Sequence, residues 1–404
     1  MTEATLTRKQ YSIMTFLLFW CGLIILSSMY MTIPLLTIFS KEFSITLEQS
    51  AWAGSAFSFC YAIGCLLFGP FSDQYGRKIF LFTSIFLLSF ITIAISFVSQ
   101  FYILVILRAL QGLVAAAFAP LSLVYAGEMF PKEKRVTAIG FISLGLFMAG
   151  IIGQVYVGVF QKFTQWSYSF LLIGLIYLVT SYFVYRYLPD DFIPTSKTSS
   201  LKQAVRKMYQ QIKERQLLFA FPITFSILFS LVGVYTMLGH YLSLQYGLQE
   251  QDILMIRAIG IVGMLISPFA GRIAARFGML QTLRVGLLLS ITSLLFMITQ
   301  PNLILIIILT IFFVMGLSLV NPINISVINL IANKARGSAL SFNAFILFLG
   351  ASSSPIMAIF LLKNELYQLA FLLFSLFLFI GMLSSLFIKL PTSMNILNKK
   401  MKSS

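Results

Sequence analysis

The chain has 404 residues, of which 59% are hydrophobic and only 10% are charged, and its mean hydropathy is +0.94. A soluble domain has about a quarter of its residues charged, so this composition excludes a soluble protein and indicates a polytopic membrane protein. The net charge of +16 would suit nucleic-acid binding, but the basic residues gather in loops on one side of the predicted spans, so they set topology instead.

The long apolar runs predict an all-α membrane protein with twelve transmembrane helices, since each span needs about 20 apolar residues. In the loops on one side of the membrane, the only basic residues are Lys41, Lys162 and Lys363. The other side carries the remaining loop lysines and arginines, so it is expected to be cytoplasmic, together with both termini. The predicted spans are 13–39, 48–70, 79–98, 101–126, 137–160, 166–188, 217–241, 251–274, 280–299, 303–328, 338–361 and 366–388.

These spans predict three parts: an N-terminal six-helix bundle (1–188), a cytoplasmic linker (189–216), and a C-terminal six-helix bundle with a basic tail (217–404). The linker is polar and basic. Cys21, Cys60 and Cys65 all fall in spans. We interpret them as small apolar fillers rather than as a disulfide or a metal site.

The first span is polar near its centre, with Ser27, Ser28 and Tyr30 followed by Pro34. Polar side chains at membrane depth face a bundle interior or a water-filled cavity. For the serines two interpretations stay open, because small hydroxyls either line a cavity or join neighbouring helices. Tyr30 is expected to line a cavity.

A short charged turn, GPFSDQYGRKIFL at Gly69–Leu81, separates the second and third spans. The spacing G-x-x-x-D-x-x-G-R-K resembles the signature loop between helices 2 and 3 of the major facilitator superfamily of secondary transporters. The chain as a whole is similar to bacterial inner-membrane exporters of the drug and metabolite efflux type. The resemblance implies the major facilitator fold, with two pseudo-symmetric six-helix bundles. It also implies a gate role for the loop residues Gly69, Asp73, Gly76, Arg77 and Lys78.

The same turn recurs in the second half, where Gly271–Leu280 aligns with Gly69–Lys78, and Pro120 and Pro322 share the offset. The chain therefore contains two homologous halves, an arrangement in which transporter sites lie between the repeats. The second copy keeps the glycines and loses the charges. Ala275, Met279 and Leu280 replace Asp73, Arg77 and Lys78.

The fourth span carries an intramembrane cation, Arg108, in the run LRALQGL. A charge at this depth costs about 2.5–3.5 kcal/mol on insertion scales, which makes it a functional candidate. The pattern of Arg108, Gln111 and Gly112 is similar to the family's helix 4 motif, whose arginine is linked to proton coupling. The alternative is a structural arginine whose donors are satisfied by backbone carbonyls.

Glu128, at the end of the fourth span, is expected to pair with Arg77. Asp73 is expected to face the start of the eleventh span near Ser338, because helix N-termini attract carboxylates. Both contacts would close a cytoplasmic gate and favour an outward-open state. The alternative is that these residues are solvated loop charges.

The fifth span is rich in small residues, which allow close helix contacts. It resembles the antiporter motif of drug exporters imperfectly, because Ala149-Gly150 and Gly153-Gln154 stand where that motif has Gly-Pro and Gly-Gly. This departure weakens the case for drug antiport.

Several polar residues in the second half are candidates for the transport site. His240 titrates near neutral pH and would carry protons, or it is an interfacial residue. Arg257 is a second intramembrane cation, which binds substrate or pairs with Glu250 or Asp252. Together with Arg108 and Gln111, these two residues are assigned to proton coupling or substrate binding. The predicted cavity lining is Ser27, Tyr30, Tyr235, Asn321, Asn324 and Asn343.

The sequence thus predicts a secondary active transporter that exports a small organic solute in exchange for protons. Since none of the twelve acidic residues falls at mid-span, uptake or uniport of a neutral or anionic metabolite is the alternative. A second alternative is a membrane sensor that has the same fold but does not transport. An enzyme is not expected, because one histidine without a buried acid supplies no catalytic set. We expect a monomer in the lipid bilayer, with a small-molecule substrate and protons as partners, and no cofactor, metal or nucleic acid.

Overall fold

The structure is a computed structural model that describes residues 7–50, 52–161, 163–190, 214–299, 302–332, 336–363 and 366–390. All regular structure within these ranges is helical. The chain forms two compact units, one of Met1–Pro131 with Phe141–Ala204 and one of Lys132–Gly140 with Val205–Ser404. Most of the predicted linker lies outside the described residues, so its boundaries stay a prediction.

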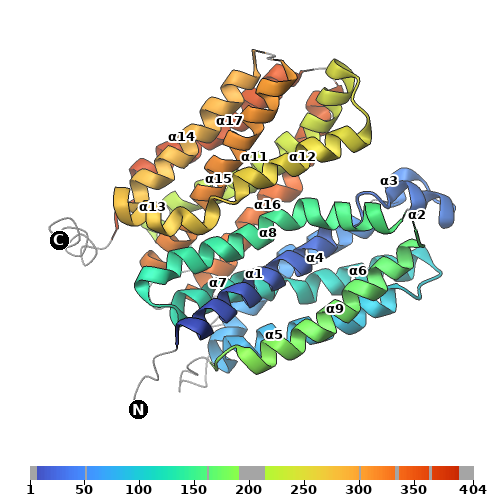
Figure 1. Cartoon of the computed structure of the whole chain (residues 1–404), viewed down its shortest axis with the longest axis horizontal. Helices are drawn as coiled ribbons and strands as arrows, with labels where there is room; N and C mark the ends of the chain where they lie inside the picture. The colour runs from blue at the N-terminus through green and yellow to red at the C-terminus, as the bar shows by residue number, and fades with distance from the viewer. Residues whose placement is uncertain are drawn as a thin grey trace. The chain divides into compact units, whose positions relative to one another are not determined.

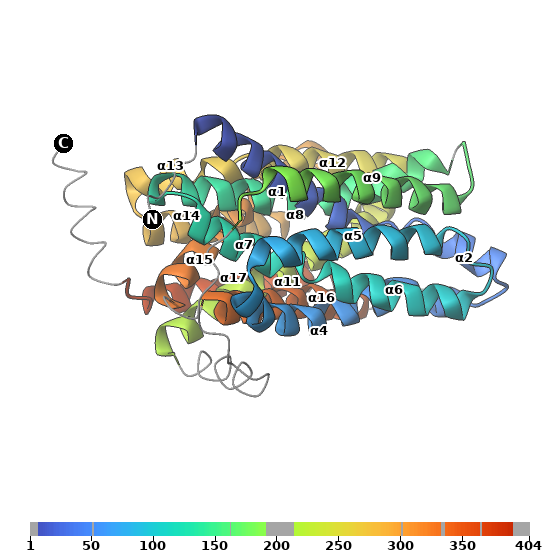
Figure 2. The ribbon, with the colours of Figure 1, turned by 90° about the horizontal axis from the view of Figure 1, so that it is seen from below.

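In the first unit, α5 packs along α9, and α4 packs along α6 (Figures 1 and 2). The first residues of α8, up to Gly140, belong to the second unit. The helices are α1 (Arg8–Tyr30), α2 (Leu36–Glu42), α3 (Leu47–Ser50), α4 (Trp52–Tyr75), α5 (Arg77–Ile95), α6 (Phe101–Ala115), α7 (Phe118–Met129), α8 (Lys132–Phe160) and α9 (Trp166–Tyr187).

In the second unit, α11 packs against α16 and α17, while α14 packs against α15 and α17. The elements are α11 (Arg215–Tyr246), α12 (Glu250–Met264), the short 3-10 helix η1 (Ser267–Phe269), α13 (Ala270–Phe277), α14 (Met279–Met297), α15 (Leu303–Ala332), α16 (Arg336–Lys363) and α17 (Tyr367–Leu386).

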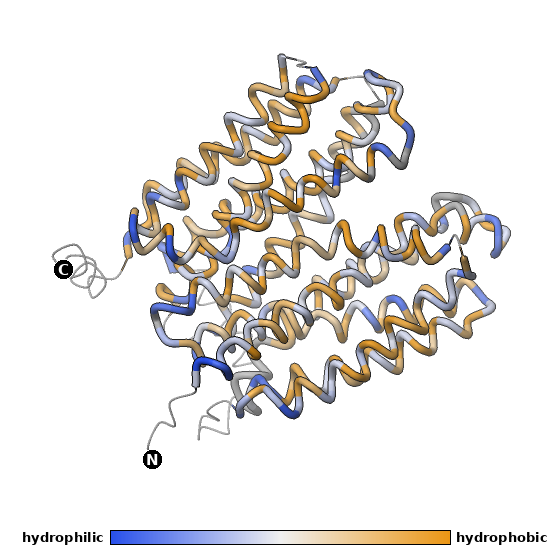
Figure 3. Tube along the Cα trace, viewed as in Figure 1, coloured by the Kyte–Doolittle hydropathy of each residue, from blue (hydrophilic) through white to orange (hydrophobic). Residues whose placement is uncertain are grey.

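Ten helical segments of the described chain are long and apolar enough to cross a membrane. With α4, whose apolar part is the shorter Trp52–Phe68, and α16 they correspond one to one with the predicted spans. Figure 3 shows apolar residues along the helices and hydrophilic ones concentrated near helix ends. Large apolar side chains such as Phe59 and Leu87 are exposed, as expected for helices in lipid. The predicted all-α membrane fold is confirmed.

Three predicted spans, 13–39, 101–126 and 251–274, are not continuous helices as expected. In each case the helix ends about one turn before a proline, because the proline ring clashes with the carbonyl four residues earlier and lacks an N–H donor. The last helical residue and the proline are Tyr30 and Pro34, Ala115 and Pro120, and Met264 and Pro268. By contrast Pro322, the repeat partner of Pro120, lies inside the continuous helix α15.

Glycines of α8 allow close contact with α1, which runs beside it (Figure 1). A Cβ at Gly145 would lie 2.3 Å from the carbonyl oxygen of Phe19, and one at Gly153 would lie 2.5 Å from that of Ser27. Real side chains do not tolerate such distances, so only glycine fits at these two positions. This confirms the expected role of the small residues in the fifth span.

Candidate functional site

The duplicated turn has the same backbone conformation in both halves. Gly76 precedes α5 with φ 88° and ψ 150°, and Gly278 precedes α14 with φ 94° and ψ 145°. This region of backbone space is accessible almost only to glycine. The internal repeat predicted from sequence therefore extends to the local geometry. Gly69 and Asp73 fall in α4, but the Asp73 side chain lies outside the described residues, and so does its predicted approach to Ser338.

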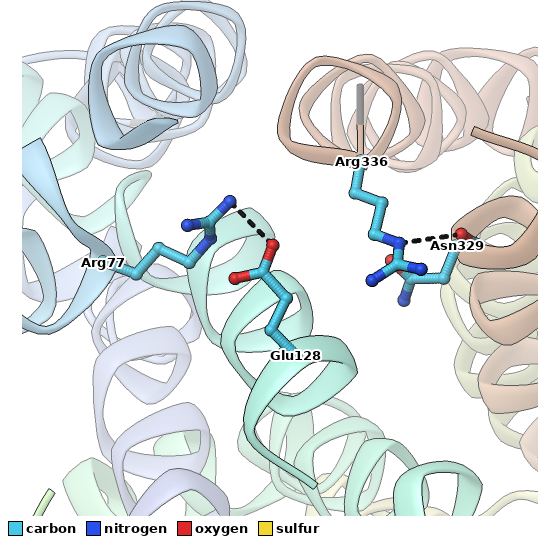
Figure 4. Close-up of polar contacts among 4 residues, drawn as sticks. All are labelled: Arg77, Glu128, Asn329 and Arg336. Atoms are coloured by element: carbon cyan, nitrogen blue, oxygen red, sulfur yellow. Dashed lines mark hydrogen bonds and ion pairs between the residues drawn. The ribbon is translucent and has the colours of Figure 1, made fainter. Parts of the chain in front are cut away.

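The first copy of the turn holds an ion pair between α5 and α7 (Figure 4). Arg77 Nη2 lies 3.0 Å from Glu128 Oε1, and the two side chains are 7% and 30% exposed. The predicted contact between Arg77 and Glu128 is confirmed. Because the guanidinium is almost completely enclosed, loss of its partner would be more costly than at a solvated surface pair.

Lys78, the next residue of the motif, makes a more exposed contact. Its Nζ lies 2.9 Å from Asp190 Oδ1, and the Asp190 side chain is 92% exposed. The ammonium also lies 5.6 Å from the centre of the Tyr185 ring. Exposed ion pairs contribute little to stability. Of the two basic residues, Arg77 therefore makes the contact suited to a switch.

In the second half, Arg336 at the start of α16 contacts the end of α15. Arg336 Nε donates to the backbone carbonyl of Asn329 at 3.2 Å (Figure 4). The side-chain amide of Asn329 is buried and has no hydrogen-bond partner in the described part of the chain. Met279 occupies the position that corresponds to Arg77. The two halves thus share a turn and differ in the charge that it carries.

Arg108 lies in α6 and is completely buried. Its Nε donates to the carbonyl oxygen of Ala53 at 3.1 Å and its Nη1 donates to Gln111 Oε1 at 2.5 Å. The guanidinium lies over the Phe57 ring, 4.5 Å from its centre. Gln111 Nε2 in turn donates to Thr92 Oγ1 at 2.8 Å. The structure therefore brings Arg108 and Gln111 together in one enclosed polar cluster. Arg108 contacts both a backbone carbonyl, as a structural arginine would, and Gln111 of the family motif.

The serines of the first span are buried in helix contacts. Ser27 donates to the Leu23 carbonyl within its own helix, and Ser28 shares a hydrogen bond with the Tyr177 hydroxyl of α9. Tyr30 is partly exposed, and its ring lies beside Gly150, where a Cβ would be 3.6 Å away. The helix-joining interpretation therefore fits Ser28, and cavity lining by Tyr30 stays a prediction.

In the second unit a buried polar cluster joins α11, α15 and α16. Asn324 Nδ2 donates to Thr224 Oγ1 at 2.8 Å, and the Thr224 hydroxyl lies 2.5 Å from Asn343 Oδ1. Asn321 is also buried. The structure thus brings two of the predicted lining residues, Asn324 and Asn343, to one hydroxyl, which the sequence analysis had not selected.

We expect Thr224→Val to lower the melting temperature of the purified protein. The change removes the donor to Asn343 Oδ1 and one of the two acceptors of Asn324 Nδ2, which also lies 3.4 Å from the Ala220 carbonyl. An unsatisfied buried polar group costs about 1–3 kcal/mol. Thr236→Val is a matched control in the same helix, because the Thr236 hydroxyl donates only to the Val232 carbonyl, at 2.8 Å. Thermal melts in detergent test this, and equal melting temperatures for the two variants would contradict it.

Arg257, the second intramembrane cation, contacts α11. Its Nη2 donates to the backbone carbonyl of Tyr235 at 2.9 Å. Asp252 is exposed and accepts from the Gln249 N–H at the start of α12, so it acts as a helix cap. The side chains of His240 and Glu250 lie outside the described residues.

Sequence reasoning did not find Thr224, Thr92 or Tyr177, although each bridges a predicted residue to a neighbouring helix. All three are hydroxyls inside apolar runs. Threonine hydroxyls inside helices commonly bond to a carbonyl one turn earlier in the same helix, as Thr236 does, and Thr224 and Thr92 make this bond as well. Nothing in the local sequence shows which hydroxyl also contacts a second helix, because that contact depends on the register between the helices.

Comparison with known proteins agrees with these observations. The model of the Major Facilitator Superfamily matches residues 18–319 and 258–403. An uncharacterized transporter of Buchnera aphidicola subsp. Acyrthosiphon pisum is 29% identical over 71% of this chain and 70% of its own length. The multi-drug resistance efflux pump PmrA of Streptococcus pneumoniae is 26% identical over 62% of this chain and 64% of its own. Among solved structures, the proton:xylose symporter XylE superposes with a TM-score of 0.71 at 16% identity, covering 95% of this chain and 96% of that one.

Proposed function

We propose that this chain, which belongs to the major facilitator superfamily, exports a small organic solute from a bacterial cytoplasm. Membership of that family makes it a membrane transporter rather than an enzyme. Transport proceeds by alternating access, with protons as the coupling ion. The basic loops, including Arg77, face the cytoplasm, and so do both termini.

The ion pair of Arg77 and Glu128 is the observation that supports alternating access most directly. A nearly buried guanidinium paired with a partly exposed carboxylate is a contact whose energy changes when the neighbouring helices move. In the proposal this contact, together with Asp73, stabilises the outward-open state and breaks in the inward-open one. Gly76 sets the path of the chain into α5, and Lys78 and Gly69 complete the turn.

Different observations support proton coupling and the direction of transport. The enclosed cluster of Arg108 and Gln111 occupies the motif position that the family resemblance links to protons, with His240 as a second candidate. Similarity to the efflux pump PmrA favours export. The second candidate function is uptake of a neutral or anionic metabolite, which the lack of mid-span acids in the sequence favours.

Transport assays in membrane vesicles of both orientations test the function. We expect solute to accumulate in inside-out vesicles when an imposed pH gradient makes the lumen acidic, and to leak passively when the gradient is collapsed. Neutral, anionic and cationic solutes should each be screened. Accumulation in right-side-out vesicles instead would establish uptake, and gradient-independent equilibration would exclude proton coupling. Failure of every solute in both orientations would support a sensor.

The gate proposal predicts that Glu128→Gln lowers the transport rate about tenfold while membrane abundance changes by less than about twofold. Loss of about 1–2 kcal/mol from one state shifts a two-state population by roughly that factor. The charge-swapped variant Arg77→Glu with Glu128→Arg should recover part of the rate. Asp190→Asn is the control, because the exposed contact of Asp190 with Lys78 should not influence transport. Wild-type transport by Glu128→Gln would contradict the gate role.

A further inference from the structure

Arg257 lies on the face of α12 that points away from lipid. Met255, Ile259 and Val262 are 62%, 36% and 58% exposed and form one apolar stripe at helical spacing. At about 100° per residue, Arg257 lies nearly opposite that stripe. It shares its face with Gly260 and the buried Ile253, so the guanidinium is directed into the contact of α12 with α11.

Two polar atoms at this contact have no hydrogen-bond partner in the described part of the chain. Arg257 uses Nη2 to donate to the Tyr235 carbonyl at 2.9 Å. Its Nε and the Tyr235 hydroxyl are both buried and have no hydrogen-bond partner among the described residues. A buried donor without an acceptor costs about 1–3 kcal/mol. The pair therefore presents two unused donors, one of them cationic.

Glycines on the facing helices make room for both groups. A Cβ at Gly239 of α11 would lie 2.5 Å from Arg257 Nη2, and a Cβ at Gly260 of α12 would lie 1.9 Å from the Tyr235 hydroxyl oxygen. Alanine at either position would displace one of the groups. The close arrangement of guanidinium and phenol thus depends on the smallest residue at both points.

The two intramembrane arginines differ in the room that they leave for a ligand. Arg108 is 0% exposed, donates to Ala53 and Gln111 and keeps Nη2 without a hydrogen-bond partner among the described residues, whereas Arg257 is partly exposed. Asp252, the described acid closest to Arg257 along α12, is occupied as the helix cap. A cation at membrane depth is stabilised by a counter-ion, and Arg257 is the arginine that a mobile anion would reach.

We propose that Arg257 and Tyr235 recognise the carboxylate of an organic acid that is the substrate of this transporter. The carboxylate accepts one hydrogen bond from Arg257 Nε and one from the Tyr235 hydroxyl, so it satisfies both donors and neutralises the guanidinium. This inference rests on the proposed transport function and narrows its substrate to organic anions.

Ligand-induced thermal stabilisation of the purified full-length protein tests the site. The probes are aliphatic and aromatic monocarboxylates at neutral pH, each paired with the primary amide of the same skeleton. We expect at least one acid to raise the melting temperature and its amide to have no effect. Arg257→Gln should remove the shift, and Arg257→Lys should retain part of it. Tyr235→Phe should weaken the apparent affinity about tenfold, since a hydrogen bond to a charged group is lost.

Two control variants address alternative roles for Arg257. Arg284→Gln removes an arginine of the same unit that donates to Ser385, and it should keep the acid-dependent shift. Glu250→Gln tests the ion pair that the sequence left open. If Arg257→Gln and Glu250→Gln each lower the ligand-free melting temperature and the double variant lowers it no further, the partner of Arg257 is Glu250 and the proposal is wrong.

The remaining outcomes are equally decisive. An acid-dependent shift that survives Arg257→Gln, an equal shift by acid and amide, or no shift across the panel would overturn the site. Vesicle transport of a neutral or cationic solute without acid-selective binding would leave the transport function intact and remove only this inference. Acid-selective binding without transport in either vesicle orientation would keep the carboxylate site but remove the transport function, and with it the assignment of the acid as substrate.

Discussion

Arg108→Met is expected to abolish gradient-driven transport while membrane abundance stays within about twofold of the wild type. The guanidinium is completely enclosed, and burying a charge carries a large desolvation cost, which an apolar side chain of similar volume avoids. Gln111 Oε1 loses its donor, at a cost of about 1–3 kcal/mol, which the removal of the buried charge offsets. A purely structural arginine would therefore be replaceable, and a coupling arginine would not.

Vesicle assays measure gradient-driven transport, and quantitative blotting measures the abundance of each variant in the membrane. Arg284→Met is the control, because Arg284 donates to Ser385 at 3.0 and 3.3 Å and has no proposed role in coupling. Arg108→Lys should also fail, since an ammonium does not reproduce the fork that reaches both Ala53 and Gln111. If Arg108→Met transports at the wild-type rate, the residue is structural and proton coupling must be assigned elsewhere.

Gly112→Ala is expected to make the purified protein lose its folded state at a lower temperature than the wild type. A Cβ at Gly112 would lie 2.1 Å from the carbonyl oxygen of Phe57 and 2.8 Å from its carbonyl carbon and Cα. These are backbone atoms, so no side chain rotates away and α6 must separate from α4. Overpacking of this kind costs about 1–3 kcal/mol or more, and the shift would also disturb Arg108, which lies one turn away.

Gly158→Ala provides the matched control, because a Cβ at Gly158 meets nothing within 4 Å. In that open position alanine is favoured over glycine in a helix by up to about 1 kcal/mol. Size-exclusion profiles after a heating series measure both variants. We expect early loss of the monodisperse peak for Gly112→Ala alone. Equal heat resistance of the two variants would show that the contact of α6 with α4 adjusts without penalty.

The membrane fold and the motif contact could be predicted from the sequence, for a physical reason. A span needs a continuous apolar run, and the charged turn between two such runs fixes where α5 begins. The predicted pair of Arg77 and Glu128 followed from the family motif, and the structure confirms it. The helix breaks before Pro34, Pro120 and Pro268 were missed, although the steric rule for proline applies to each. Pro322 shows why that rule alone is insufficient, since α15 continues through it.

The candidate site was less accessible to sequence reasoning. The apolar stripe of Met255, Ile259 and Val262 is readable from spacing, and it shows which way Arg257 points. Its contact with the Tyr235 carbonyl depends on the register between α11 and α12, which no local pattern encodes. The same holds for Thr224, whose position between Asn324 and Asn343 requires three helices to be aligned.

The proline breaks have a consequence for hydration inside the bilayer. A proline frees the carbonyl one turn before it, and an acceptor in the hydrocarbon region costs several kcal/mol unless something solvates it. At the break between α6 and α7 the donor that approaches the Ala116 carbonyl is the Cys65 thiol, at 3.8 Å, which is a weak substitute. Water molecules that enter the interior of this protein are therefore expected to bind first at the free carbonyls of the helix breaks. These breaks would then provide a series of polar hydration sites within the otherwise apolar bundle.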